Sequence, residues 1–192
     1  MDWSLLLQII GTALGLLYLW LEYKANIWLW VIGAIMPVVH GLLYLTNGIY
    51  ADAAMQLYYV AAGIYGLVMW KRRSQHKGGG KIQHTPKEWI LNLVVIYLFF
   101  HAELYILLVE FTDSTVPFFD SMSTALCIVA MWMLSRKLVE QWLVWLVVDI
   151  ISVGLYIYKG IPITAGLYTI YCILAIVGYV RWYKQAKLQA NN

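Results

Sequence analysis

Charged side chains are scarce in this sequence. Only 12% of the 192 residues are charged, whereas 62% are hydrophobic. Soluble globular domains are about one quarter charged and about half apolar, so this balance excludes an ordinary soluble domain and indicates a chain that lipid surrounds. The net charge is +3, and nearly all basic residues lie between apolar segments, where they set orientation. We therefore expect no nucleic-acid partner.

Cysteine and the motifs of catalysis are also scarce. The two cysteines, Cys127 and Cys172, lie inside apolar stretches without a neighbouring Cys or His at a ligand spacing, so we interpret both as small core residues. The sequence has no recognisable nucleophile-base pair, no glycine-rich phosphate loop and no metal-ligand cluster. These absences argue against an enzyme and against a nucleotide-driven pump, and we expect neither a metal nor a cofactor.

Long apolar runs, in contrast, fill the chain. A membrane-spanning helix needs about 20 mainly apolar residues. The run that starts at Trp3 has no basic stretch before it and no cleavage-site pattern after it, so we expect it to remain as a helix. The predicted spans are 3–22, 27–46, 50–70, 88–110, 116–135, 140–158 and 162–183.

One connection, 71–87, is long, and the glycines at 78–80 predict a flexible stretch within it. At its end, Thr85, Pro86 and Glu88 predict an N-cap, a first-turn proline and a capping-box acid for the fourth span.

The basic residues predict the orientation. If the N-terminus lies outside, 12 of the 13 Lys and Arg residues fall in or beside inside connections, and only Lys159 falls outside. Inside loops carry the excess of basic residues, so we expect the N-terminus outside and the C-terminus inside.

The two halves of the chain match when the sequence is shifted by 112 residues. The matches are Trp20 with Trp132, Trp30 with Trp142, Trp70 with Trp182, Tyr59 with Tyr171, Gly66 with Gly178, and Lys24 with Arg136. We predict an all-α membrane protein with seven transmembrane helices, in which residues 1–73 and 116–185 are three-helix repeats and 88–110 is a linker helix. Because three helices are an odd number, the linker gives both repeats the same orientation. Such a 3+1+3 parallel arrangement is a transporter architecture; a duplicated scaffold without a transport role is the alternative.

An ionisable side chain at membrane depth is costly and is therefore a functional candidate. Asp149 lies near the middle of the sixth predicted span and shares a helical face with Trp142 and Trp145. Aromatic rings beside one carboxylate suit a planar cationic ring, through stacking, cation–π contact and hydrogen bonds. The alternative is an interhelical hydrogen bond from Asp149 to a Ser, Thr or Tyr.

Two other spans carry polar candidates. Glu103 in the fourth span is a second acid that we expect to be buried, either paired with His101 or in contact with a substrate. Gln56 in the third span shares a face with Tyr59 and could read the edge of a ring through its amide. Simple bridging between helices is the alternative for Gln56.

Several motifs resemble a known family. They are F-F-D-S at 118–121, S-R-K-x-x-E-x-W-L-x-W from Ser135 to Trp145, Y-x-Y-K-G at 156–160, L-E-Y-K-A-N at 21–26 and Q-x-x-Y at 56–59. In this order they resemble the Pnu family of bacterial vitamin transporters over almost the whole chain. The resemblance implies a multi-pass protein of the bacterial inner membrane, with a periplasmic N-terminus and a cytoplasmic C-terminus. It also implies facilitated diffusion without ion or ATP coupling, followed by trapping of the vitamin by a separate cytoplasmic kinase.

The resemblance also implies a site and a substrate. In the nicotinamide riboside branch the ligand lies in a central pocket, which here would be formed by Gln56, Tyr59, Trp142, Trp145 and Tyr168. That branch commonly has Asn where this sequence has Asp149, and it has a glutamate where this sequence reads Gly166-Leu167-Tyr168. These departures favour the thiamine-transporting branch. Thiamine uptake is therefore the expected function, with nicotinamide riboside uptake by the same mechanism as the alternative.

The remaining alternatives are a sugar uniporter of similar layout and a membrane enzyme that uses Glu103, Asp149 and Cys172. The expected partners are a small-molecule vitamin, membrane lipid and a vitamin kinase, and the sequence leaves a homo-oligomer open.

Overall fold

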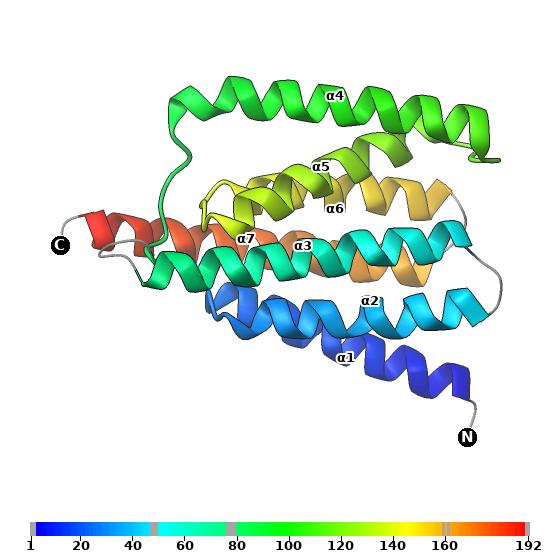
Figure 1. The fold of residues 1–192 in the computed structure, drawn as a ribbon, viewed down its shortest axis with the longest axis horizontal. Coiled ribbons are helices and arrows are strands. Elements are labelled where there is room, and N and C mark those ends of the chain that lie inside the picture. Colours follow the sequence, from blue (N-terminus) through cyan, green and yellow to red (C-terminus); the bar gives the residue numbers. More distant parts are fainter. Residues whose placement is uncertain (1–2, 47–49, 76–79, 159, 161, 191–192) are drawn as a thin grey trace. The chain divides into compact units, whose positions relative to one another are not determined.

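The structure, a computed structural model, describes residues 3–46, 50–75, 80–158, 160 and 162–190. Seven α-helices lie within these residues (Figure 1). They are α1 (Trp3–Tyr23), α2 (Trp28–Thr46), α3 (Tyr50–Ser74), α4 (Lys87–Phe111), α5 (Pro117–Ser135), α6 (Gln141–Tyr158) and α7 (Pro162–Ala190). The predicted all-α fold and the order of its helices are confirmed.

Most helix ends lie within one residue of the predicted span ends. Two helices run further, because α3 continues to Ser74 and α7 continues to Ala190. Both extensions are rich in basic residues, and basic side chains in a last helical turn interact favourably with the helix dipole. These two helices therefore extend beyond the apolar runs that predict the spans.

Four helical segments are long and apolar enough to cross a membrane, as judged over the residues that the structure describes. They are Lys87–Phe111, Pro117–Ser135, Gln141–Tyr158 and Ala165–Ala190.

The chain divides into two compact units, Met1–Gly80 and Lys81–Asn192. In the first unit α2 packs against both α1 and α3. In the second unit α4 packs along α5, α5 along α6, and α6 along α7. Of the glycines at 78–80, the first two lie outside the described residues, and so does Lys159.

The same tight turn joins α1 to α2 and α5 to α6. Ala25 has a φ of 51° and Lys137, 112 residues later, has a φ of 54°. Positive φ is uncommon for residues with a side chain. The turn hydrogen bonds also recur: Ala25 N donates to Glu22 O at 2.8 Å, and Lys137 N donates to Leu134 O at 2.9 Å. The two halves thus share local geometry as well as sequence.

The cores of the two units are built from corresponding aromatic residues. In the first unit Trp30 is buried against Trp70, with ring centroids 5.7 Å apart. In the second unit Trp142 is buried against Trp182, with ring centroids 5.8 Å apart. Each indole ring also covers a glycine, Gly66 beneath Trp30 and Gly178 beneath Trp142.

The start of α4 differs from the prediction. Its N-cap residue is Pro86, and no side chain caps the helix. The Thr85 hydroxyl instead donates a hydrogen bond to the carboxylate of Glu140, at 2.7 Å. The predicted capping box is therefore wrong, because a carboxylate from a distant part of the chain takes the hydroxyl that would have capped the helix.

Candidate functional site

Asp149 is buried among three helices of the second unit. Its side chain is only 7% exposed, and it lies within α6, a helix long and apolar enough to cross a membrane. Its charge acts on Cys127 of α5 and on Tyr168, Tyr171 and Cys172 of α7. Groups of α5 and of α7, the two helices that pack on α6, therefore lie within electrostatic range of the carboxylate.

The Asp149 carboxylate has no hydrogen-bond partner among the described residues. The alternative role for Asp149, an interhelical hydrogen bond to a Ser, Thr or Tyr, is thus not found in that part of the chain. One helical turn earlier, the indole N–H of Trp145 is also buried and lacks an acceptor there. Buried polar groups are nearly always hydrogen-bonded, so an unmatched acceptor and an unmatched donor on one helix face suit a polar ligand.

Tyrosines of α6 and α7 form an aromatic group near this acid. Tyr156 and Tyr168 are stacked, with ring centroids 5.2 Å apart and planes at 24°, and a hydrogen bond joins their side chains. Tyr171 meets Tyr168 edge to face at 5.5 Å. Aromatic rings prefer offset-stacked or edge-to-face contacts, and an aromatic ligand near Asp149 could contact these rings in the same way.

The structure places two predicted site residues, Asp149 and Tyr168, in this neighbourhood, with Trp145 one helical turn away. Sequence reasoning missed Cys127, Tyr156 and Tyr171. Two of these carried a usable signal, since Tyr156 begins the Y-x-Y-K-G motif and Tyr171 matches Tyr59 in the 112-residue shift. Cys127 carried none, because a lone cysteine in an apolar run is indistinguishable from other small core residues.

Trp142 has a different environment from Trp145. Its ring fills the space between Trp182 and Gly178, and its indole N–H is buried without an acceptor among the described residues. This packing repeats that of Trp30 in the first unit. The geometry therefore gives Trp142 a place in the helix core rather than on an open surface.

Glu103 is exposed, so the prediction that it is buried is wrong. The face of α4 that packs on α5 carries Leu93, Tyr97 and His101, which follow one another at four-residue spacing. His101 hydrogen-bonds Ser121 at 3.1 Å and stacks on Tyr97, and no bond to Glu103 is found among the described residues. Glu103 lies two residues beyond His101, a spacing that turns its side chain away from that face.

Gln56 and Tyr59 belong to α3 in the first unit. Gln56 is half-buried there, and Tyr59 is 37% exposed, with its ring 5.5 Å from that of Tyr58. Whether they act together with Asp149 stays a prediction. No group of three His, Cys, Asp or Glu side chains that could hold a metal ion occurs in the described part of the chain.

Apolar helices of membrane-spanning length, together with a buried acid beside aromatic side chains, are typical of a membrane transport protein. The chain belongs to the nicotinamide mononucleotide transporter family, whose sequence model matches residues 5–184. The resemblance to the Pnu vitamin transporters is thereby confirmed, and the chain is a multi-pass membrane protein of that family.

Two curated relatives illustrate the range of the family. The nicotinamide riboside transporter PnuC of Escherichia coli (strain K12) is 27% identical over an alignment of 211 residues, gaps included, which covers 97% of this chain and 88% of the relative. The riboflavin/roseoflavin transporter RibM of Streptomyces davaonensis is 27% identical over an alignment of 196 residues, which covers 96% of this chain and 86% of the relative. Both relatives match nearly the whole chain.

A solved structure has the same fold. The crystal structure of the vitamin B3 transporter PnuC superimposes with a TM-score of 0.69, covering 92% of this chain and 80% of that one. Because only 22% of the residues are identical, this likeness concerns the fold alone.

Proposed function

We propose that this protein takes up nicotinamide riboside across the bacterial inner membrane by facilitated diffusion. The observation that supports a cationic vitamin is the buried Asp149 carboxylate, which has no hydrogen-bond partner among the described residues and lies near the tyrosines of α7. The similarity to nicotinamide riboside transporters supports the choice among such vitamins. Nicotinamide riboside has a cationic aromatic ring. The carboxylate would neutralise its charge, and the rings of Trp145 and Tyr168 would stack on it.

Thiamine is the second candidate. The family relatives named above are transporters of nicotinamide riboside and of riboflavin, so they do not support the thiamine expectation drawn from the sequence. One observation still favours it, because a carboxylate at position 149 can accept hydrogen bonds from the exocyclic amine of an aminopyrimidine, as well as balance a cationic ring.

The proposed arrangement in the membrane is seven crossings with 3+1+3 parallel repeats, a periplasmic N-terminus and a cytoplasmic C-terminus. The recurrence of the Trp–Trp–Gly core and of the positive-φ turn 112 residues apart supports the repeats. The 12 to 1 distribution of basic residues supports the orientation. Gln56 and Tyr59 of the first repeat stay predicted ligand contacts.

An uncoupled carrier can only equalise concentrations on the two sides of the membrane. Net accumulation therefore needs a second reaction, and we assign it to a cytoplasmic kinase that phosphorylates the vitamin. The added charge prevents the product from returning through a site built for the neutralised cation.

Calorimetric titration of the purified protein with nicotinamide riboside, thiamine and riboflavin tests the substrate. Nicotinamide riboside should bind more tightly than either of the others. Tighter binding of thiamine would replace the first candidate with the second. Binding of riboflavin alone would contradict a site built for a cationic ring.

A further inference from the structure

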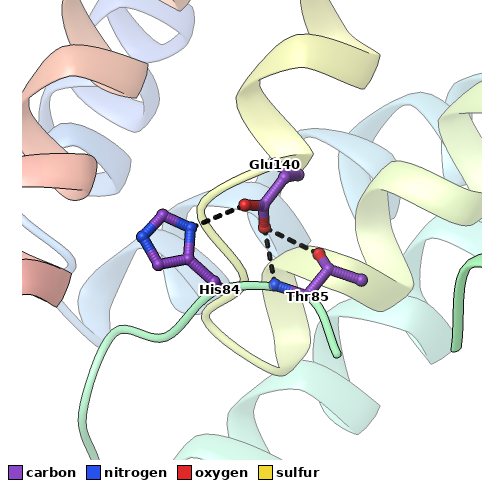
Figure 2. Close-up of polar contacts among 3 residues, drawn as sticks. All are labelled: His84, Thr85 and Glu140. Carbon is purple, nitrogen blue, oxygen red and sulfur yellow. Dashed lines mark hydrogen bonds and ion pairs between the residues drawn. The ribbon is translucent and has the colours of Figure 1, made fainter. Parts of the chain in front are cut away.

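The motif from Ser135 to Trp145 contains an acid that substrate binding does not explain. Glu140 lies immediately before α6 and accepts three hydrogen bonds (Figure 2). The ring Nδ1 of His84 donates to Oε1 at 2.7 Å. The backbone N–H and the hydroxyl of Thr85 both donate to Oε2, each at 2.7 Å. One carboxylate thus ties residues 84 and 85 to the corner between α5 and α6.

The acid is ionised at neutral pH. Burial alone would raise the pKa of Glu140, but the hydrogen bonds from His84 and Thr85 outweigh burial and lower this pKa below its ordinary value. A lowered pKa means that these bonds stabilise the folded protein above the ordinary carboxyl pKa and are lost as the pH falls through the lowered value. At neutral pH the three bonds are therefore charge-assisted, which makes them stronger than bonds between neutral groups.

The backbone of Glu140 continues the connection into α6. Its carbonyl accepts hydrogen bonds from the N–H groups of Leu143 at 3.0 Å and Val144 at 3.3 Å, which close the first turn of the helix. Trp145 and Asp149 follow one and two turns further along the same helix. The contacts of the Glu140 side chain therefore restrain the first turn of the helix that carries the candidate site.

Backbone bonds hold the same segment to the same corner. Gln83 N donates to Lys137 O at 3.1 Å, and Val139 N donates to Gln83 O at 2.9 Å. This short parallel bridge joins residues on either side of Leu138, which is fully buried.

The segment also contacts the C-terminal part of α7. Ile82 N donates to Gln189 Oε1 at 2.8 Å, and Lys81 Nζ donates to the Gln189 carbonyl at 3.0 Å. The ring of His84 lies 5.1 Å from that of Tyr183, edge to face. Residues 81–86, which we name the clasp, thus join the α5–α6 corner to α7.

The clasp is a property of the second half of the chain. In the 112-residue shift Glu140 corresponds to Trp28, which is 60% exposed. The first corner therefore has no acid at this position, although its backbone turn is the same. Of the two corresponding turns, only the second has an acid at this position, and it lies in the half that holds Asp149.

We propose that Glu140 is a positioning residue for ligand binding. Through the clasp it holds the start of α6 against α7, and so it sets where Trp145 and Asp149 stand relative to Tyr168. The ligand-binding part of this inference rests on the proposed function, whereas the anchoring of α6 does not.

Hydrogen–deuterium exchange of the purified full-length protein tests the anchoring. In Glu140→Ala the amides of residues 141–145 should exchange about tenfold faster, because losing one charge-assisted bond weakens local closure by at least that factor. Glu140→Gln should restore slow exchange, since its amide oxygen still accepts from Thr85 and its NH₂ can donate to an unprotonated His84 Nδ1. Glu88→Ala, which removes an exposed acid in the first turn of α4, is the matched control and should exchange like the wild type.

Titration of the same variants tests the positioning, with nicotinamide riboside and thiamine as probes. Glu140→Ala should weaken binding about tenfold, since small displacements of binding groups are costly, and Glu140→Gln should recover most of the affinity. A folded Glu140→Ala with wild-type affinity overturns the positioning role, as does a Glu140→Gln that binds as weakly as Glu140→Ala.

Two outcomes need a second variant or the exchange measurement alone. If Glu140→Ala does not fold, Thr85→Val removes only the hydroxyl donor and should speed exchange of the same amides by about threefold, from loss of a single hydrogen bond; unchanged exchange there overturns the clasp. If the wild type binds neither probe, the proposed function fails, and the exchange measurement alone decides whether Glu140 anchors α6.

Discussion

The indole rings of Trp142 and Trp182 meet edge to face, with centroids 5.8 Å apart and planes at 87°. In the first unit Trp30 and Trp70 meet in the same way, at 5.7 Å and 85°. Each pair is related to the other by the 112-residue shift that was visible in the sequence. The shift therefore relates packing as well as residue type, and it explains why the tryptophans and their facing glycines occur in both halves.

The facing glycine gives the first prediction. A Cβ at Gly178 would lie 2.6 Å from Cε2 of Trp142, and the indole cannot retreat because it is buried against Trp182. Overpacking of a core typically costs about 1–3 kcal/mol, so Gly178→Ala should lower the melting temperature in detergent. Gly154→Ala is the control, because a Cβ at that α6 glycine meets nothing within 4 Å and alanine favours a helix over glycine. Equal melting temperatures for the two variants would contradict the tight packing.

The second prediction concerns the charge at the candidate site. Asp149→Asn keeps the shape of the side chain and removes its charge. Loss of a charge-assisted hydrogen bond is worth about 1.5–3 kcal/mol, so affinity for the cationic vitamin should fall by about ten- to a hundredfold. Calorimetric titration measures this affinity. Glu110→Gln, which changes an exposed acid of α4, is the control. Wild-type affinity in folded Asp149→Asn would remove this residue from the site.

The third prediction concerns orientation. Gln75, just after α3, should face the cytoplasm, and Thr112, just after α4, should face the periplasm; both are exposed. In cells whose outer membrane has been made permeable, a membrane-impermeant thiol reagent should label Thr112→Cys strongly and Gln75→Cys no more than the wild type, whose Cys127 and Cys172 are half-buried. The reverse pattern would invert the proposed topology.

The helices could be predicted closely from the sequence because apolar runs of fixed length and basic connections are strong, local signals. Helix ends were less predictable, since α3 and α7 continue into basic residues that no longer resemble a span. Asp149 could be chosen because a carboxylate in an apolar run is conspicuous. The surroundings of Asp149 could not be predicted, because Cys127 and Tyr171 reach it from other helices.

The errors have a common physical cause. Thr85 and Glu88 fit a capping box, yet the Thr85 hydroxyl bonds a carboxylate 55 residues away. Glu103 was assigned to the interior by its depth in an apolar run, yet only one face of α4 packs on α5. In each case the outcome depends on which residues of another helix or segment lie opposite, and a local pattern does not show that.

Uptake into liposomes tests the central claim most directly. Purified protein is reconstituted with unlabelled nicotinamide riboside inside, and labelled nicotinamide riboside is added outside without any sodium, proton or voltage gradient. Facilitated diffusion predicts that label enters faster than into empty liposomes, and that this exchange is unchanged when ion gradients are imposed. No entry of label above that of empty liposomes, or accumulation of free vitamin that requires an ion gradient, would contradict the account.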